Sequence, residues 1–259
     1  MADLALITGA SSGIGRAYAQ RLAARGHDLI VVARRGERLR DLAAELSRVD
    51  VQVVVADLAE PDGIDAVAGI ADGRPVTMLV NNAGVAHYMP LAELPPARAR
   101  EVVNVKVLAP TLLTRAVLPG MLARGGGTIV TVAGMIAFAG PAPASVMPRR
   151  AVYAGALAGA VAMSQTLAAE LEGTGVRVQV VCPGVVATEF HTVQGMDLSA
   201  IPRMSAEDVV TASLAGLRLG EVVCAPGVED ATLLERVFAA DLAAFAGQRH
   251  EPASRYGAG

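Results

Sequence analysis

The sequence has few aromatic residues, few cysteines and no strong charge imbalance. Aromatic residues make up 3 % of its 259 residues, with no tryptophan, so the core must be built from alanine, valine and leucine. Two cysteines, Cys182 and Cys224, each end a short apolar run and lie far apart in the chain. This placement predicts reduced thiols buried in strands and gives no spacing for a disulfide framework or a metal site. A net charge of −3 without a basic stripe argues against a nucleic-acid partner.

Signals for export or membrane insertion are also lacking. The first residues, MADLALITGA, contain no basic region and reach Gly9 too early for a signal peptide. The longest stretch of small apolar residues, Tyr153 to Met163, is well short of the roughly 20 residues that cross a bilayer. We therefore expect a soluble, cytoplasmic protein with no membrane partner.

Strand and helix patterns alternate along the chain. Short apolar runs predict strands at 4–8, 28–33, 51–56, 76–84, 127–134, 176–182 and 221–225. Helical patterns lie between them, at 15–26, 38–49, 61–72, 97–123, from Tyr153 to about 172, at 205–219 and at 230–246. Strands separated by such helices pair in parallel through right-handed crossovers.

This order predicts an α/β fold in a single domain over 1–259. The strands are continuous apolar runs, as in a sheet buried on both faces. We expect a Rossmann domain, with a doubly wound parallel sheet of about seven strands and helices on both faces. Ligands bind such sheets at the carboxyl ends of the strands. The irregular segment 189–205 follows the sixth strand there and is predicted to be a substrate lid.

The segment TGASSGIG (8–15) joins the first strand to the first helix. Gly9 permits the sharp turn, Gly13 lets a phosphate approach the backbone, and Gly15 lets the helix pack on the strand. The free N–H groups and dipole of the helix N-terminus favour a pyrophosphate. Because these glycines stand at the first strand–helix turn, they predict a dinucleotide site.

The end of the second strand carries Ala33, Arg34 and Arg35. A carboxylate here would bond a ribose 2′-hydroxyl, whereas guanidinium groups bind phosphate. The sequence therefore favours NADP(H) over NAD(H). A solvated pair of arginines at the start of the next helix is the alternative.

Six motifs in order resemble the short-chain dehydrogenase/reductase family along nearly the whole chain. They are TGASSGIG, Asp57 after the third strand, NNAG (81–84) after the fourth, Asn104 in the long helix, Tyr153, and PGVVAT (183–188). The resemblance implies hydride exchange between a nicotinamide and a carbonyl or alcohol. It also implies a cofactor site made up of Gly9, Ser11, Ser12, Gly13, Ile14, Gly15, Arg34, Arg35, Asp57, Leu58, Asn81, Ala83, Gly84, Tyr153, Pro183, Gly184, Val186 and Thr188.

The same resemblance implies a catalytic tetrad of Asn, Ser, Tyr and Lys, which this chain matches only in part. Asn104 and Tyr153 match and are the predicted catalytic residues. Leu157 stands at the lysine position and Gly134 at the serine position. A phenol has an ordinary pKa of about 10, and a nearby cation is the usual means of lowering it. We therefore expect weak or altered acid–base catalysis.

Four residues are candidates to compensate. Arg149 or Arg150 could place a cation beside the phenol of Tyr153, and Ser145 could supply a hydroxyl from the same stretch. His87 could act as a replacement acid, although His87 and Tyr88, which follow NNAG, are first predicted to contact substrate. Lys106 is two residues past Asn104 and is predicted to point from a different helix face.

Three functions remain open on the sequence. The first is an NADP(H)-dependent oxidoreductase acting on a small molecule with an incomplete tetrad. The second is a catalytically silent NADP(H)-binding protein, such as a sensor or assembly partner. The third is a non-redox enzyme that uses the same pocket. Helix faces rich in alanine and glycine, and the resemblance itself, favour a homodimer or homotetramer.

Overall fold

A computed structural model describes residues 3–143, 145 and 147–257. Contacts divide the chain into two compact units, Met1–Pro226, which carries the sheet, and Gly227–Gly259. The second unit contains α9 (Thr232–Ala246) and a short 3-10 helix, Ser254–Tyr256.

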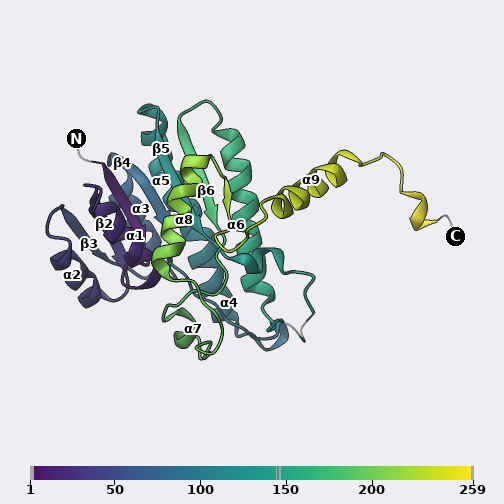
Figure 1. Ribbon diagram of the computed structural model, residues 1–259, viewed down its shortest axis with the longest axis horizontal. Helices are drawn as coiled ribbons and strands as arrows, with labels where there is room; N and C mark the ends of the chain where they lie inside the picture. Colours follow the sequence, from purple (N-terminus) through teal and green to yellow (C-terminus); the bar gives the residue numbers. More distant parts are fainter. Residues whose placement is uncertain (1–2, 144, 146, 258–259) are drawn as a thin grey trace. The chain divides into compact units, whose positions relative to one another are not determined.

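The first unit is built on a seven-stranded parallel sheet (Figure 1). Its strands are β1 (Leu4–Thr8), β2 (Asp28–Ala33), β3 (Val51–Val55), β4 (Val76–Asn81), β5 (Gly127–Val132), β6 (Val176–Val181) and β7 (Val223–Cys224). Their order is β3-β2-β1-β4-β5-β6-β7. The first three strands are added toward one edge of the sheet and the last four toward the other, so the switch point lies between the neighbours β1 and β4. This confirms the predicted doubly wound sheet, and a ligand crevice is expected at that switch point.

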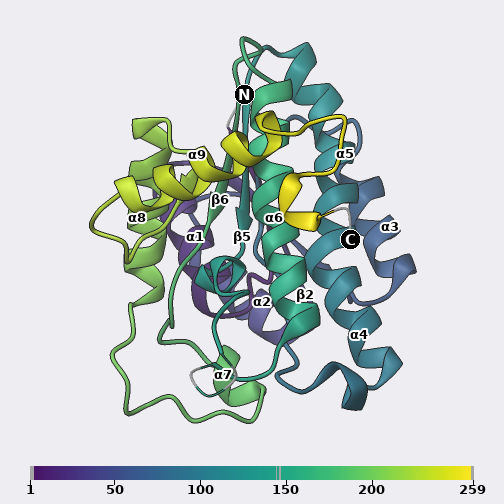
Figure 2. The same cartoon turned by 90° about the vertical axis from the view of Figure 1, so that its right-hand side faces the viewer.

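Helices cover both faces of the sheet (Figure 2). They are α1 (Gly13–Ala23), α2 (Gly36–Glu45), α3 (Pro61–Ala71), α4 (Pro96–Val103), α5 (Ala109–Ala123), α6 (Ala151–Glu170), α7 (Phe190–Val193) and α8 (Ala206–Leu219). Helices α1 and α8 pack together on one face, while α3 packs beside α5, and α4 beside α6, on the other. The central strands are buried on both sides: all five residues of β1 are buried, as a continuous apolar run requires.

The helix predicted over 97–123 is interrupted. Residues Asn104–Leu108 form a π-helical turn, η2, between α4 and α5. One wide turn changes the direction in which the following side chains point, and such turns occur often at functional sites. The interruption therefore decides which side chains of this helix face the sheet.

Two helical stretches, Pro96–Ala123 and Ala151–Glu170, are long and apolar enough to cross a membrane, each with a mean hydropathy of 1.3. Both are longer than Tyr153–Met163, the longest apolar stretch identified from the sequence. Both lie against the sheet, with α5 on β4 and β5 and α6 on β6. Core helices of soluble proteins can have the same length and composition, so these two helices are weak evidence for a membrane span.

Candidate functional site

A cavity of about 1000 Å³ lies at the carboxyl ends of the strands, around the switch point. It is lined by the loops that follow β1, β2, β3, β4, β5 and β6. Most of the predicted site residues meet in this wall. They are Gly9, Ser11, Ser12, Gly13, Ile14, Arg34, Arg35, Asp57, Leu58, Ala83, Gly84, His87, Tyr88, Tyr153, Pro183, Gly184, Val186 and Thr188.

Three predicted site residues lie outside the wall. Gly15 stands behind it, where a Cβ atom would collide with the carbonyl oxygen of Gly9. Asn81 is buried behind the pocket and donates from Nδ2 to the Thr114 hydroxyl at 3.3 Å. Asn104 donates from Nδ2 to the carbonyl oxygen of Ala59 at 2.6 Å. These three residues shape the pocket from behind.

The glycine-rich turn forms an open cradle. Gly13 has φ +53°, a left-handed conformation that glycine adopts without strain. A Cβ atom on Gly13 would lie 2.8 Å from Cγ2 of Thr188, on the opposite wall. Ser12 is the N-cap of α1, yet no side chain caps this helix end. The first N–H groups of α1 therefore remain available to an anion.

Arg35 is anchored beside this cradle. Its guanidinium donates to the hydroxyls of Ser11 and Ser12, both at 2.9 Å. Arg35 also pairs with the carboxylate of Glu189, which accepts a second contact from Arg38 at 2.8 Å. Partial burial raises the pKa of Glu189, but hydrogen bonds from Arg38, Ser12 and Arg35 outweigh it and lower the pKa to about 2. Glu189, in the segment predicted to be a lid, thus forms an ion pair with Arg35, one of the two arginines predicted to hold a phosphate.

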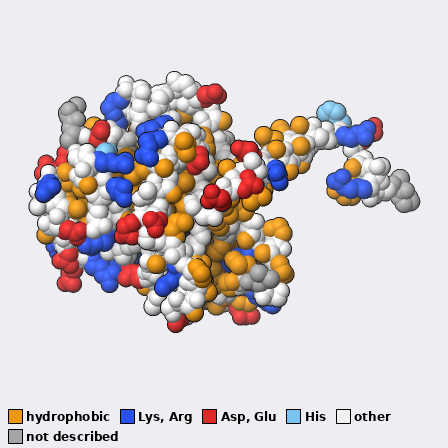
Figure 3. Space-filling model, viewed as in Figure 1, with side chains coloured by type: hydrophobic (Ala, Val, Ile, Leu, Met, Phe, Trp, Pro, Cys, Tyr) orange, Lys and Arg blue, Asp and Glu red, His pale blue; other side chains and the backbone are white. Residues whose placement is uncertain are grey.

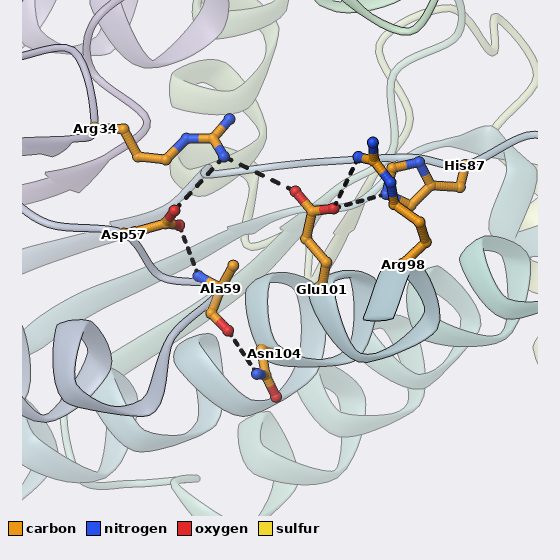
Figure 4. Close-up of polar contacts among 7 residues, drawn as sticks. All are labelled: Arg34, Asp57, Ala59, His87, Arg98, Glu101 and Asn104. Atoms are coloured by element: carbon orange, nitrogen blue, oxygen red, sulfur yellow. Dashed lines mark hydrogen bonds and ion pairs between the residues drawn. The ribbon is translucent and has the colours of Figure 1, made fainter. Parts of the chain in front are cut away.

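On the other side of the pocket, polar side chains form a chain of contacts (Figure 4). Arg34 lies 3.7 Å from the Asp57 carboxylate and 3.8 Å from that of Glu101. Glu101 also accepts from Nε2 of His87 at 2.9 Å and contacts Arg98 at 3.3 Å. His87 is therefore held by a carboxylate of α4 rather than directed at Tyr153.

Tyr153 is buried among aromatic rings. Only 6 % of its surface is exposed, and its ring lies 5.6 Å from that of Tyr88, edge to face, and 6.4 Å from that of Phe190. Burial, with a smaller contribution from Tyr88, raises the pKa of Tyr153 well above its ordinary value. Its phenol is thus held in the neutral form.

The positions that depart from the family pattern lie next to each other. Leu157, one turn after Tyr153 on α6, is 1 % exposed. A Cβ atom on Gly134 would lie 3.5 Å from Cδ1 of Leu157, which is ordinary contact. Both residues line the pocket, so an apolar surface occupies this part of the wall.

The inserted stretch before α6 places its basic residues elsewhere. Arg150 is 8 % exposed and donates to the carbonyl oxygens of Pro148, at 2.8 Å, and Ala139, at 2.6 Å. Burial raises the pKa of Tyr88 to about 12, and the charge of Arg150 opposes that shift. Arg149 and Ser145 are exposed. Arg150 therefore acts on Tyr88 and on the loop, and it makes no hydrogen bond to Tyr153.

Lys106 points in a different direction from Asn104, as predicted, and that direction is toward the pocket. Its side chain lines the pocket, and its Nζ donates to the carbonyl oxygens of Val132 at 2.9 Å and Ala83 at 3.4 Å. Burial lowers its pKa from 10.5 to about 8. The helix predicted over 97–123 is unbroken, whereas the structure has a π-helical turn at Asn104–Leu108, and Nζ of Lys106 in this turn reaches the ends of β4 and β5. Hydrophobic periodicity gives no signal for such a turn.

Comparison with known proteins identifies the family. The short chain dehydrogenase family model matches residues 3–197. The chain belongs to the short-chain dehydrogenase/reductase family. Its Rossmann sheet and strand-end pocket are those of a short-chain dehydrogenase, and the predicted resemblance is confirmed.

Individual relatives span most of this short-chain dehydrogenase. Sulfoacetaldehyde reductase 2 of Chromohalobacter salexigens is 38 % identical over 198 residues, which are 75 % of this chain and 77 % of the relative. The chain spans a smaller share, 57 % and 60 %, of two other curated relatives.

Solved structures share the whole fold. A short-chain dehydrogenase from Sphingobium yanoikuyae in complex with NADPH has a TM-score of 0.91 and 33 % identity, over 97 % of this chain and 98 % of that one. A bulky-bulky ketone specific alcohol dehydrogenase from Comamonas testosteroni has a TM-score of 0.87 and 29 % identity, over 98 % of each chain.

Proposed function

We propose that this protein is an NADP(H)-dependent oxidoreductase that interconverts a bulky apolar ketone and its alcohol. The observation that carries the cofactor assignment is the guanidinium of Arg35, held by Ser11 and Ser12 at the mouth of the glycine cradle. A fixed guanidinium recognises phosphate oxygens in a bidentate manner. The Sphingobium yanoikuyae protein of the same fold is a complex with NADPH.

The pocket fits this cofactor along its length. The uncapped N-terminus of α1 and Gly13 would hold the pyrophosphate. Arg35 would hold the 2′-phosphate, and Arg34 and Asp57 would flank the adenosine. The segment Pro183–Thr188 would border the nicotinamide. Bound NADPH supplies a hydride equivalent to the carbonyl carbon.

The 2′-phosphate would meet Glu189 at Arg35, since both are anionic and use the same donors. Glu189 opens the segment that contains α7 (Phe190–Val193). We propose that the phosphate replaces the carboxylate and so frees this lid, residues 189–205. Cofactor binding and access to the substrate site would then be linked through Arg35 and Arg38.

Apolar side chains form the part of the pocket beyond the predicted nicotinamide position. Tyr88, Met89, Ile136, Met147 and Phe190 line it together with Tyr153. Hydrophobic side chains also gather on the surface around the β5–α6 loop (Figure 3). A wall of this kind favours a bulky apolar substrate over a small charged one, and the Comamonas testosteroni relative is described as specific for bulky-bulky ketones.

Within this site Tyr153 would hydrogen-bond the carbonyl oxygen through its neutral phenol. Asn104 would act at a distance, since its amide ties α4 and η2 to the β3–α3 loop through Ala59. Gly134 leaves the end of β5 without a hydroxyl beside the substrate. Loss of one oxyanion-type donor costs about 10²–10³ in rate, so slow turnover is expected.

A second function has a specific observation in its favour. Tyr153 has a raised pKa and lies beside Leu157, without an ion pair to lower that pKa among the described residues. These properties suit a protein that binds NADP(H) without oxidising or reducing it, because such a protein needs no acid–base group at Tyr153. A non-redox enzyme would instead convert substrate while the absorbance of NADPH stays constant.

The remaining assignments rest on the family and on surface composition. We propose a single functional domain over 1–259 that acts in the cytoplasm as a homodimer or homotetramer. Apolar side chains exposed on η2, α4 and α6, namely Val103, Val107, Leu108 and Met163, support self-association.

The test is NADPH oxidation with a panel of aromatic ketones and diketones, using the wild type and Tyr153→Phe. The proposal predicts NADPH-dependent reduction that the variant lowers by at least about 10²-fold. Tight NADPH binding with no turnover across the panel would favour the silent binder instead.

A further inference from the structure

Lys106 is the single lysine among the 22 lysine and arginine residues of the chain. The other residues of this group are all arginines, whose side chains end in a guanidinium. This one amine is 8 % exposed and lies in the wall of the proposed active site. Lysine is rarely buried without a partner, so its presence at this position needs a physical reason.

Backbone geometry explains how Lys106 reaches the pocket. Asn104, at the start of the π-helical turn, is tied to the carbonyl oxygen of Ala59 at 2.6 Å. With this end held, Nζ of Lys106 reaches between the ends of β4 and β5, to Ala83 and Val132. Val132 is two residues before Gly134, where Leu157 packs. The ammonium of Lys106 therefore lies near the part of the wall where Leu157 replaces the lysine of the family pattern. It comes from η2, whereas Leu157 belongs to α6.

The hydrogen bonds of Lys106 leave one donor available. An ammonium has three N–H donors, and the protein supplies two acceptors, at 2.9 Å and 3.4 Å. A Cβ atom on Gly84 would lie 3.2 Å from Nζ, so the absence of a side chain at Gly84 keeps this side of the amine uncovered. Gly84 itself lines the pocket.

No described carboxylate neutralises Lys106. The titratable side chains on the helices packed against η2 are Arg98, Arg100 and Glu101 of α4, Arg115 of α5, and Tyr153 and Glu170 of α6. His87 and Tyr88 line the same pocket. Among all of these described groups none forms an ion pair or hydrogen bond with Nζ: Glu101 is paired with Arg34, His87 and Arg98.

We propose that Lys106 is the proton-supplying residue of this site: its free N–H replaces, through water in the pocket, the proton that Tyr153 gives to the substrate oxygen. The inference rests on the proposed oxidoreductase function. When the carbonyl carbon accepts a hydride, the π pair of the C=O bond moves to oxygen, which takes the proton of the Tyr153 phenol. The phenolate is reprotonated from the Lys106 ammonium through water in the pocket, and the resulting neutral amine takes up a proton from the solvent. In the oxidation direction each transfer is reversed.

The chemistry of the amine suits this role better than a guanidinium would. Arginine stays protonated at every pH at which a protein is folded. Burial lowers the pKa of Lys106 to about 8, so its proton is exchangeable near neutral pH. A general acid works best with a pKa near the working pH. This explains why lysine stands here in a chain that otherwise uses arginine.

The first test reads Lys106 directly, without turnover. Protein labelled with ¹³C-lysine gives one Cε signal, because the chain has one lysine. We expect this signal to titrate with a midpoint at about 8 and to shift when NADPH saturates the pocket. A midpoint near the ordinary value of 10.5, or a signal that does not respond to bound NADPH, would overturn the proposal. NADPH binding is followed separately by cofactor fluorescence, so failure to bind at all would count against the proposed function instead.

The second test uses matched variants. Lys106→Met removes the ammonium and keeps a flexible apolar side chain, and Arg115→Met removes an exposed charge from α5 as the control. Lys106→Met should lower kcat by about 10²-fold and abolish the loss of activity above pH 8, while NADPH affinity changes less than threefold. Lys106→Arg should not restore the rate.

The double variant Lys106→Met/Leu157→Lys should recover at least tenfold over Lys106→Met, because it returns an amine to the same wall from α6. An unchanged rate and pH profile in Lys106→Met would refute the role of Lys106. A wild type that binds NADPH but turns over no ketone would refute the role of Lys106 together with the proposed function, and the ¹³C titration would then report only the protonation state of the buried amine.

Discussion

Replacing Lys106 with methionine should change how the stability of the protein depends on pH. In the folded state burial lowers the pKa of Lys106 to about 8, against 10.5 in the unfolded chain. Below pH 8 the amine is charged in both states, and the folded state bears the full cost of burying it. Between pH 8 and 10.5 the folded state has released the proton that the unfolded state still binds. The wild type therefore becomes more stable as pH rises through this window.

The magnitude follows from the size of the shift. Each pKa unit corresponds to about 1.4 kcal/mol, so the whole window is worth about 3 kcal/mol. Between pH 7 and 9.5 the wild type should gain about 2 kcal/mol relative to Lys106→Met, or about 4–8 °C in Tm for a domain of this size.

The assay is urea or thermal unfolding of the wild type, Lys106→Met and Arg115→Met at several pH values from 7 to 10. Only the difference between wild type and Lys106→Met should grow with pH. Curves that stay parallel for all three proteins would show that Lys106 has an ordinary pKa, and the reasoning about its burial would be refuted.

Three further predictions concern other parts of the site. Gly13→Ala places a Cβ atom 2.8 Å from Thr188 at a φ of +53°. It should weaken NADPH binding by at least about tenfold, measured by titration, and lower the free energy of unfolding by about 1–2 kcal/mol. Unchanged affinity would contradict a pyrophosphate site at the glycine-rich turn. Glu189→Gln removes the anion that occupies Arg35, and should tighten NADPH binding severalfold with no effect on NADH in the same titration. An equal gain in affinity for both cofactors would show that Glu189 does not compete with the 2′-phosphate for Arg35. Gly134→Ser has room for its Cβ atom, 3.5 Å from Leu157 and 3.6 Å from the carbonyl oxygen of Pro183, and should keep Tm within a few degrees while raising kcat on aromatic ketones by about tenfold or more. A fall in Tm of more than about 8 °C would show that the space is needed.

Much of the fold could be predicted because its signals are local. The strand at 28–33 is a continuous run of apolar residues, and the glycines at 9, 13 and 15 mark the turn after the first strand. Burial on both faces and the demand for a tight turn leave few alternatives for such segments. The predicted strand ends differ by a few residues, most clearly at β7, which pairs over only Val223–Cys224.

The features that could not be predicted depend on contacts between distant segments. The π-helical turn at Asn104–Leu108 is stabilised by the hydrogen bond from Asn104 to Ala59, 45 residues away. The pattern of apolar residues in the sequence does not indicate this turn. The position of Glu189 on Arg35 and Arg38 likewise joins residues that lie about 150 positions apart. Such long-range contacts decide which of the site's charged groups are paired and which are available.

The measurement that tests the central claim most directly is a paired equilibrium titration of the wild type and Arg35→Met with NADPH and NADH. The account predicts that the wild type binds NADPH at least about tenfold more tightly than NADH, a difference of about 1.4 kcal/mol, and that Arg35→Met loses this preference while its NADH affinity is kept. Equal affinities of the wild type for the two cofactors, or a preference that survives in Arg35→Met, would contradict it.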